Sequence, residues 1–242
     1  MEYAAGPATD FLTRILFPRR CPVCGNIVPF GKGLICRSCF SELSFIKSPC
    51  CKKCGKEVMN ERIEYCYDCS RHVRHFQRGM ALLNYNEAAA RSMAGIKYHN
   101  KREYLDFYGE AAVRRYGKAI TRIDPDVLIP VPIHPSRLRS RGFNQAEIFA
   151  RIIGKRLGIP VRTDILKRNR KTDPQKELTP KERLQNLEQA FSAEGMPNHI
   201  HRVLLADDIY TTGSTIEACT RALKQQGVDE IYFLTICIGY GR

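Results

Sequence analysis

The string at residues 203–215, VLLADDIYTTGST, constrains the fold of this chain more than any other stretch. It opens with a short apolar run of the length and composition of a buried strand. Two adjacent carboxylates, Asp207 and Asp208, follow where that strand is expected to surface, and we call them the acid pair. Helical periodicity begins after a short loop, with Ser214 and Glu217 at the spacing of a capping box. The string therefore predicts a strand, a loop and a helix in direct succession, with Ser214 as the helix N-cap.

The loop after the acid pair has the composition of a phosphate-binding site, and we call it the hydroxyl loop. Its members are Thr211, Thr212, Gly213, Ser214 and Thr215. Unpaired N–H groups at a helix N-terminus lie at the positive end of the helix dipole and bind phosphate. The glycine lets the backbone approach the anion, and the hydroxyls add donors. Because carboxylates accept hydrogen bonds from sugar hydroxyls, the two features predict a ligand with a vicinal diol and a phosphate, such as ribose 5-phosphate.

A plainer interpretation of the same string is a strand-to-helix turn whose hydroxyls only cap the helix and whose aspartates only face water. Capping needs one hydroxyl and no acid pair, so this interpretation leaves most of the string unexplained. A Walker A loop is also a poor match, because the string has no GxxxxGK pattern and no lysine in the loop.

A second candidate anion site follows the strand expected at residues 126–132. The candidate residues of this site are Pro132, Arg137, Arg139 and Arg141. Guanidinium groups match phosphate oxygens, and a helix is expected to follow over residues 144–157. Because loops at the carboxyl ends of parallel strands line one crevice, we expect this arginine-bearing loop to face the same ligand as the acid pair. The alternative is that the arginines are merely solvated.

Eight cysteines near the N-terminus form a repeat in which each counterpart follows 30 positions later, as Cys51 follows Cys21. Each half holds a CxxC, eleven residues that begin with glycine, and a second CxxC. The members are Cys21, Cys24, Cys36, Cys39, Cys51, Cys54, Cys66 and Cys69. Two CxxC turns supply four thiolates to a tetrahedral zinc ion. The repeat predicts two structural zinc sites in tandem ribbons, and the spacing fits sequential and interleaved pairing of the CxxC turns equally well.

A disulfide framework is the alternative for these cysteines, and it would imply a secreted protein. Residues 1–18 lack a basic segment followed by an uninterrupted apolar one, so a secretory signal is not expected, and we predict a short amphipathic helix there instead. No apolar run is long enough to span a membrane, and we expect a cytoplasmic protein. Cys50 could replace Cys51 as a ligand, whereas Cys219 and Cys237 lie in apolar contexts and are expected in the core.

The formal net charge of +14 suits a protein that binds phosphates or nucleic acid. Basic and aromatic residues occur around the CxxC turns: Arg19, Arg20, Lys32, Arg37, Lys52, Lys53, Lys56 and Arg71, with Phe30, Phe40, Phe45, Tyr65 and Tyr67. Cations and stacking faces of this kind bind single-stranded nucleic acid. A solvated basic surface over a structural zinc module explains the same residues, and the sequence leaves both interpretations open.

Two known families resemble these strings. The apolar run, the acid pair and the TGST loop are similar to the binding motif for phosphoribosyl pyrophosphate (PRPP) in type I phosphoribosyltransferases. The strings IPVP at 129–132, RGFNQ at 141–145, KTDPQ at 171–175 and RLQNL at 183–187 resemble the ComF family, whose members carry an N-terminal zinc module. The resemblance implies an α/β domain with a mostly parallel sheet and helices on both faces over residues 81–242, preceded by a double zinc ribbon over residues 1–80.

The resemblance also implies ligands and partners. PRPP or another ribose phosphate would bind with Mg²⁺, the acid pair would hold the sugar hydroxyls, and the hydroxyl loop would hold the 5′-phosphate. The residues from Pro132 to Arg141 would lie on the pyrophosphate side. In a transferase the acid pair would stabilise oxocarbenium character as the C1–O bond breaks. The family further implies a role in handling incoming single-stranded DNA during natural transformation, next to a competence helicase.

Three functions remain open from the sequence. The first is a phosphoribosyltransferase with an unidentified acceptor, which the intact acid pair and hydroxyl loop favour. The second is a single-stranded DNA-handling protein that keeps the fold, which the charge and the ribbons favour. The third is a regulator that senses PRPP without chemistry. A polar segment at residues 168–191 is also expected to act as a mobile lid over the site.

Overall fold

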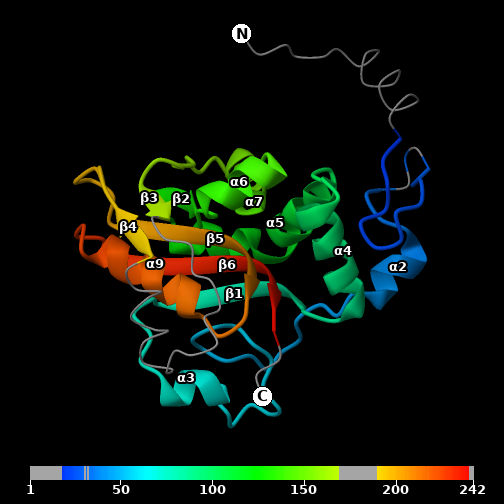
Figure 1. The fold of residues 1–242 in the computed structure, drawn as a ribbon. Helices are drawn as coiled ribbons and strands as arrows, with labels where there is room; N and C mark the ends of the chain where they lie inside the picture. Colours follow the sequence, from blue (N-terminus) through cyan, green and yellow to red (C-terminus); the bar gives the residue numbers. More distant parts are fainter. Residues whose placement is uncertain (1–17, 30, 32, 169–189, 240–242) are drawn as a thin grey trace, which may run out of the picture.

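The computed structural model describes residues 18–29, 31, 33–168 and 190–239, and its centre is a four-stranded parallel sheet (Figure 1). The strands lie in the order β1-β6-β5-β2, and every neighbouring pair runs parallel. Their bounds are Arg78–Asn84 for β1, Val127–Pro130 for β2, Arg202–Tyr210 for β5 and Glu230–Ile238 for β6. The predicted α/β class with a parallel sheet is confirmed.

Strand β5 is longer than its apolar run predicts. We expected the strand to surface at Asp207, but the pairing with β6 continues through Asp207↔Thr235 to Tyr210↔Ile238. Continued hydrogen bonding to β6 keeps this stretch extended, because a polar side chain does not prevent its backbone from joining a ladder. The acid pair therefore lies inside the last part of the strand.

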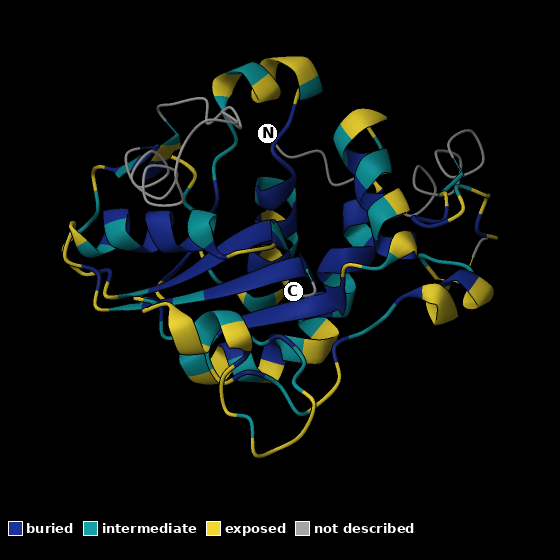
Figure 2. Cartoon of the chain, turned by 60° about the horizontal axis from the view of Figure 1, so that its bottom comes forward, coloured by how far each residue is buried: buried dark blue, intermediate teal, exposed yellow. Residues whose placement is uncertain are grey.

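Three helices cover one face of the sheet (Figure 1). They are α4 at Glu87–Tyr98, α5 at Tyr104–Ile123 and α7 at Gln145–Leu157, and their buried residues join those of the sheet in one apolar cluster. Helix α5 continues past Gly117 because Ile120 continues the buried stripe. It ends where Asp124 adopts a left-handed conformation with φ 50°. Figure 2 shows the strands as buried segments between layers of half-exposed helices.

The opposite face is covered by α9 at Ser214–Lys224 and by a two-stranded antiparallel sheet. That sheet pairs β3 at Leu166–Arg168 with β4 at Phe191–Ala193. Residues 161–165 form no strand of the main sheet, since Val161 makes only an isolated parallel bridge with Leu128. Thr163 and Asp164 are polar and exposed, so this stretch brings no continuous apolar stripe to bury in the main sheet.

The two CxxC halves adopt the same local structure at the predicted offset. The antiparallel bridge Arg20↔Ile27 recurs as Cys50↔Glu57, and each half ends in a short helix, α2 at Arg37–Glu42 and α3 at Tyr67–Arg71. Gly25 and Gly55 both have a positive φ, at 74° and 78°. This conformation is inexpensive for glycine alone, which explains the glycine that follows each first CxxC.

The two ribbons lie against different faces of the α/β domain (Figure 1). Val23 and Leu43 of the first ribbon belong to the same buried cluster as Leu105 of α5. Cys54 of the second ribbon instead belongs to the cluster that contains Phe233 of β6. The segment between the ribbons runs along the edge of β1, where Ile46 N–H donates to the Leu82 carbonyl at 3.1 Å. The predicted domain boundary at residues 80 and 81 stays a prediction.

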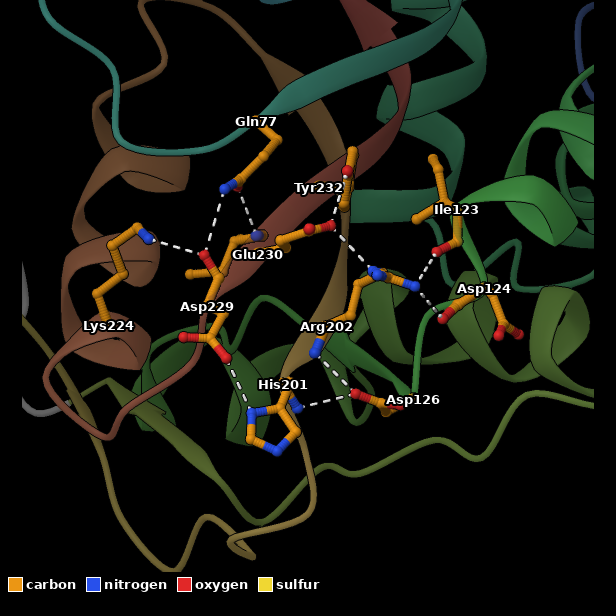
Figure 3. A network of polar contacts seen from close by, with 11 residues as sticks. Gln77, Ile123, Asp124, Asp126, His201, Arg202, Lys224, Asp229, Glu230 and Tyr232 are labelled. Atoms are coloured by element: carbon orange, nitrogen blue, oxygen red, sulfur yellow. Dashed lines mark hydrogen bonds and ion pairs between the residues drawn. The ribbon is translucent and has the colours of Figure 1, made fainter.

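A polar network fixes the amino ends of β5 and β6, far from the acid pair (Figure 3). One carboxylate oxygen of Asp126 accepts from the backbone N–H groups of His201 at 2.8 Å and Arg202 at 2.7 Å. The Arg202 guanidinium in turn bonds Glu230 at 2.9 Å and the Ile123 carbonyl at 2.8 Å. These contacts hold the amino ends of β5 and β6 together and join them to the segment that precedes β2.

Two predicted features lie wholly or mostly outside the described residues: the amphipathic helix at residues 1–18 and the lid at residues 168–191. Within the described part of the chain, no helix combines the length and the apolar character needed to cross a membrane.

Candidate functional site

The acid pair is buried in β5, and two helices on one face of the sheet hold Asp208. Asp207 is 8% exposed and Asp208 is 6% exposed. One oxygen of Asp208 lies 2.7 Å from Lys97 Nζ of α4 and 2.9 Å from Gln145 Nε2 of α7. Because adjacent side chains on a strand point to opposite faces, Asp207 lies toward α9, where its charge acts on Cys219. The pair thus spans both layers of the domain.

The pKa values of the two carboxyls are shifted in opposite directions. Burial raises the pKa of Asp207 well above its usual value, and the neighbouring Asp208 charge adds to this effect. Burial also opposes ionisation of Asp208, but the Lys97 ammonium and the Gln145 amide outweigh it and lower the pKa of Asp208. A buried acid with a cation partner stays charged, whereas one beside a like charge tends to keep its proton. The site therefore holds one firmly ionised carboxylate next to one that protonates readily.

The hydroxyl loop follows directly and leads into α9, but its cap differs from the prediction. Gly213 is the N-cap residue, with φ 78°, and the helix begins at Ser214. The expected capping box is wrong, because the Ser214 hydroxyl bonds the Thr212 hydroxyl at 2.9 Å and Glu217 is turned toward His75. A Cβ on Gly213 would lie 2.2 Å from the Tyr210 hydroxyl, so both the backbone angle and the packing require glycine.

The buried carboxylate of Glu217 is held by partners from outside the hydroxyl loop. One of them is His75, whose side chain is 41% exposed. Its ring contacts the Glu217 carboxylate, whose side chain is only 3% exposed, and its backbone N–H donates to the same carboxylate at 3.1 Å. Arg221 bonds Glu217 as well, at 3.1 Å. A buried carboxylate needs such partners, which explains why Glu217 is unavailable for capping.

The arginines lie on a short helix, α6 at Pro135–Arg141, rather than on the predicted loop. Proline at the first helical position and His134 as the N-cap start this helix, since the Ser136 N–H donates to His134 Nδ1 at 3.2 Å. Arg141 is half-buried and donates to the Gln145 side chain, which bonds Asp208. The structure therefore connects Arg141 to the acid pair through one intervening residue.

The other members of the arginine group are placed differently. Arg137 and Arg139 are exposed, and no described hydrogen bond or ion pair joins either to the acid pair. Arg137 lies near Arg168. Burial lowers the pKa of Arg168 most, and the like charge of the Arg137 guanidinium lowers it further. Pro132 is half-buried just beyond β2, where Val131 N–H donates to the Ala206 carbonyl at 2.8 Å. The strand end that carries Pro132 thus runs beside the strand that carries the acid pair.

Sequence reasoning missed Lys97 as a site residue. Lysine in the last turn of a helix is common, because a cation there is favoured by the helix dipole, and nothing in the local pattern distinguishes Lys97 from such a residue. Gln145 entered the sequence-based prediction only as part of the RGFNQ string, without a role of its own. Only the packing of α4 and α7 against β5 shows that both side chains converge on Asp208.

Two clusters of four cysteines have the geometry of zinc sites. Within each cluster the four sulfur atoms all lie within 4.8 Å of one another. Zinc with Zn–S bonds of about 2.3 Å holds its ligands roughly 3.8 Å apart in a tetrahedron. The separation between Cys24 and Cys36 sulfurs is 3.9 Å, and that between Cys54 and Cys66 sulfurs is 3.6 Å, so both clusters fit zinc.

The cysteine geometry resolves three of the open questions. Pairing is sequential, with Cys21, Cys24, Cys36 and Cys39 in one cluster and Cys51, Cys54, Cys66 and Cys69 in the other. The disulfide alternative is wrong, since all eleven cysteines are free thiols. Cys50 stays outside the cluster and donates to the Lys47 carbonyl at 3.1 Å. Cys219 and Cys237 are fully buried in the core, as predicted, and burial raises the pKa of both thiols.

Comparison with known proteins supports both halves of this architecture. Residues 12–70 match the double zinc ribbon domain, and residues 140–241 match the phosphoribosyl transferase domain. The chain is 40% identical over 109 residues to Competence protein F of Haemophilus influenzae, an alignment that covers 44% of this chain and 48% of that protein. The chain belongs to the ComF family. It is thus a ComF family protein with a double zinc ribbon and a phosphoribosyltransferase domain.

Further relatives of this ComF family protein carry related names. It is 27% identical over 159 residues to Competence protein ComFC of Bacillus subtilis, covering 62% of this chain and 60% of that protein. It is 31% identical over 113 residues to DNA utilization protein YhgH of Salmonella typhi, covering 47% and 49%. The alignments thus span about half of the relatives' lengths, or somewhat more. A purine phosphoribosyltransferase structure from Pyrococcus horikoshii Ot3 superposes with a TM-score of only 0.34 at 18% identity, covering 55% of this chain and 82% of that one.

Proposed function

We propose that this protein binds PRPP or another ribose phosphate at the acid pair and the hydroxyl loop. The observation that carries the proposal is the continuity of the two features: a buried acid pair at the end of β5 leads through Gly213 into the N-terminus of α9. The helix N-terminus supplies unpaired N–H groups for a phosphate, and Thr211 and Thr212 are exposed beside it. A carboxylate pair adjoining these donors suits the hydroxyls of the sugar that bears the phosphate.

The arginines would bind the pyrophosphate side of the ligand. Arg141 is connected to Asp208 through Gln145, and Arg137 lies near Arg168, so positive charge borders the acid pair. Mg²⁺ bound with PRPP would neutralise the pyrophosphate, and carboxylate oxygens are the ligands that this ion prefers. In a transfer reaction the acid pair would stabilise positive charge on the ribose, while the cations would stabilise the leaving group.

Titration calorimetry with Mg²⁺-PRPP tests this proposal. The zinc-loaded wild-type chain should bind, and the double variant Asp207→Asn, Asp208→Asn should bind at least tenfold more weakly while it stays folded by circular dichroism. Asp229→Asn is the matched control, because this exposed carboxyl lies at the opposite end of the sheet. A double variant that binds as well as the wild type would refute the site.

A second candidate function, binding of single-stranded DNA, is favoured by a groove between the first ribbon and α5. The groove has a volume of about 740 Å³ and is lined by Leu34, Ile35, Phe40, Phe45, Phe107, Glu110, Ala111, Arg114 and Arg115. Phe40 is 47% exposed and its ring lies 4.9 Å from that of Phe45. Exposed rings next to arginines are suited to stack bases and hold phosphates. We call this feature the aromatic groove.

The relatives suggest where such a protein would act. Their names, Competence protein F, Competence protein ComFC and DNA utilization protein, connect them to competence and to DNA use. These names support our proposal that this protein acts in the uptake or processing of single-stranded DNA during natural transformation. A competence helicase is the partner that we propose for it. In this proposal the ribose-phosphate site and the aromatic groove are two separate binding sites on one chain.

A further inference from the structure

The segment that joins the second ribbon to β1, residues 72–77, contacts the hydroxyl loop directly, and we call it the connector. Arg74 Nη2 donates to the Thr212 carbonyl at 2.7 Å. The next residue, His75, contacts the Glu217 carboxylate with both its ring and its backbone N–H. Thr212 precedes the loop glycine and Glu217 lies in the first turn of α9, so consecutive connector residues hold both sides of Gly213.

The contact with Thr212 controls how the loop presents its donors. A trans peptide is planar, and its C=O and N–H groups point in roughly opposite directions. By binding the Thr212 carbonyl, Arg74 fixes this peptide so that the Gly213 N–H is directed to the other side, away from the connector. A phosphate-binding loop works through amides whose orientation is set before the ligand arrives, because ordering them costs affinity. Arg74 is thus placed to set one of them.

Aromatic packing beneath the loop makes a second connection. Phe76 of the connector meets Phe233 edge-on, with ring centroids 5.0 Å apart and an interplanar angle of 89°. Phe233 stacks on Tyr210 at 4.9 Å and 2°, and the Tyr210 hydroxyl lies under Gly213. Cys51, Cys54 and Cys66 belong to the same buried cluster as these rings. The second cysteine cluster therefore lies near Tyr210, the side chain that packs against Gly213 of the hydroxyl loop.

The first ribbon provides a natural comparison, since it has the same local structure in another place. Its buried cysteines, Cys21 and Cys39, belong to the cluster on the opposite face, together with residues of α4 and α5. Figure 1 shows α2 beside α4 and α3 below β1. A ribbon of this size has too small a core to stay folded without its metal, so zinc loss should release whatever each ribbon holds. Loss of zinc from the second ribbon should therefore release the connector.

We propose that Arg74 and His75 couple the second zinc site to the ribose-phosphate site, so that zinc at the second site, but not at the first, keeps the hydroxyl loop ready to bind phosphate. Arg74 and His75 are positioning residues, because they act through Thr212 and Glu217. The inference rests on the proposed PRPP site for its effect on binding. By linkage, PRPP should in turn raise the affinity of the second site for zinc and leave the affinity of the first unchanged.

Single substitutions in the connector test the coupling without touching a cysteine. Arg74→Ala and His75→Ala should each weaken Mg²⁺-PRPP binding about tenfold in calorimetry, while zinc content stays at two per chain. His72→Ala is the matched control, because its side chain is exposed on the same segment, and it should bind like the wild type. Unchanged affinity in both Arg74→Ala and His75→Ala would overturn the proposal.

Amide hydrogen exchange of residues 211–215 tests the coupling independently of PRPP. Cys69→Ser should speed exchange in the loop, whereas Cys39→Ser, its counterpart 30 positions earlier, should not. If Cys69→Ser does not fold, Arg74→Ala takes its place in the same measurement, with faster loop exchange expected again. Equal loop exchange in the second-site variant and the wild type, or equal changes from both ribbons, would overturn the proposal. Absence of PRPP binding by the wild type would instead refute the proposed function and leave the exchange result to decide the coupling.

Discussion

Lys97 Nζ lies 2.7 Å from the Asp208 carboxylate, and this ion pair joins the last turn of α4 to the end of β5. The lysine side chain is 20% exposed and the aspartate side chain 9%, so water screens the pair only weakly. The contact links the position of a helix to the ionisation of a carboxyl in the candidate site.

Replacing Lys97 by methionine should destabilise the protein strongly at neutral pH. Breaking a buried ion pair leaves an uncompensated charge, which costs about 3–5 kcal/mol. The Lys97 contact lowers the pKa of Asp208, so in the wild type its contribution is present above the ordinary Asp value and is lost as the pH falls through the lowered value. In Lys97→Met the pKa of Asp208 should rise, so acid should relieve the defect.

Urea unfolding at pH 7 and pH 5 measures this effect. The gap in unfolding free energy between Lys97→Met and the wild type should shrink at pH 5. The double variant Lys97→Met, Asp208→Asn is the control, because it removes the unpaired charge and should recover most of the loss at pH 7. A gap that is the same at both pH values would contradict the electrostatic explanation.

Asp207→Asn should stabilise the fold at neutral pH while it weakens PRPP binding. Burial raises the pKa of Asp207 in the folded state, so the carboxyl costs no stability below its unfolded pKa and an increasing amount as the pH rises toward the folded value. The amide avoids this cost. A gain of about 1 kcal/mol would raise Tm by roughly 2–4 °C in a chain of this size. Differential scanning calorimetry at pH 7 and pH 4 should show the gain at pH 7 and little at pH 4.

Metal analysis should give two zinc ions per chain, and they should leave at different rates. Cys24 of the first cluster is exposed, whereas Cys51 and Cys54 of the second are at most 1% exposed. A chelator reaches exposed thiolates more easily, so release followed with a zinc-sensitive dye should have a fast phase from the first site and a slow one from the second. One ion per chain, or a single phase that Cys39→Ser leaves unaltered, would contradict this assignment.

Phe40→Ala should weaken the binding of oligo-dT, measured by fluorescence anisotropy. Loss of one stacking face costs about 1–3 kcal/mol, or roughly fivefold to more than a hundredfold in affinity. Tyr67→Ala is the matched control, because this aromatic is 58% exposed on α3 of the other ribbon. Affinity should also fall steeply with salt if arginines such as Arg114 contact phosphates. A larger effect from Tyr67→Ala would move the DNA site to the second ribbon.

Features with a local cause could be predicted from the sequence alone. The 30-residue repeat of cysteines and glycines specified two ribbons, because CxxC spacing and a glycine with positive φ are properties of a few consecutive residues. The order of apolar run, acid pair, hydroxyl loop and helix could likewise be predicted, and the family resemblance of these strings implied the parallel sheet. The local errors arose where a distant partner intervened: Glu217 binds His75 instead of capping α9, and β6 extends β5 through the acid pair.

The contacts between residues distant in sequence became visible only in the folded chain. Lys97 reaches Asp208 because α4 and β5 pack in one domain, and Arg74 reaches Thr212 across 138 positions of sequence. The sequence also did not predict that the two ribbons pack on different faces of the domain, because both halves specify the same local structure. Such contacts depend on how apolar faces are buried against one another, and the spacing of residues along the chain does not show which faces will pack together.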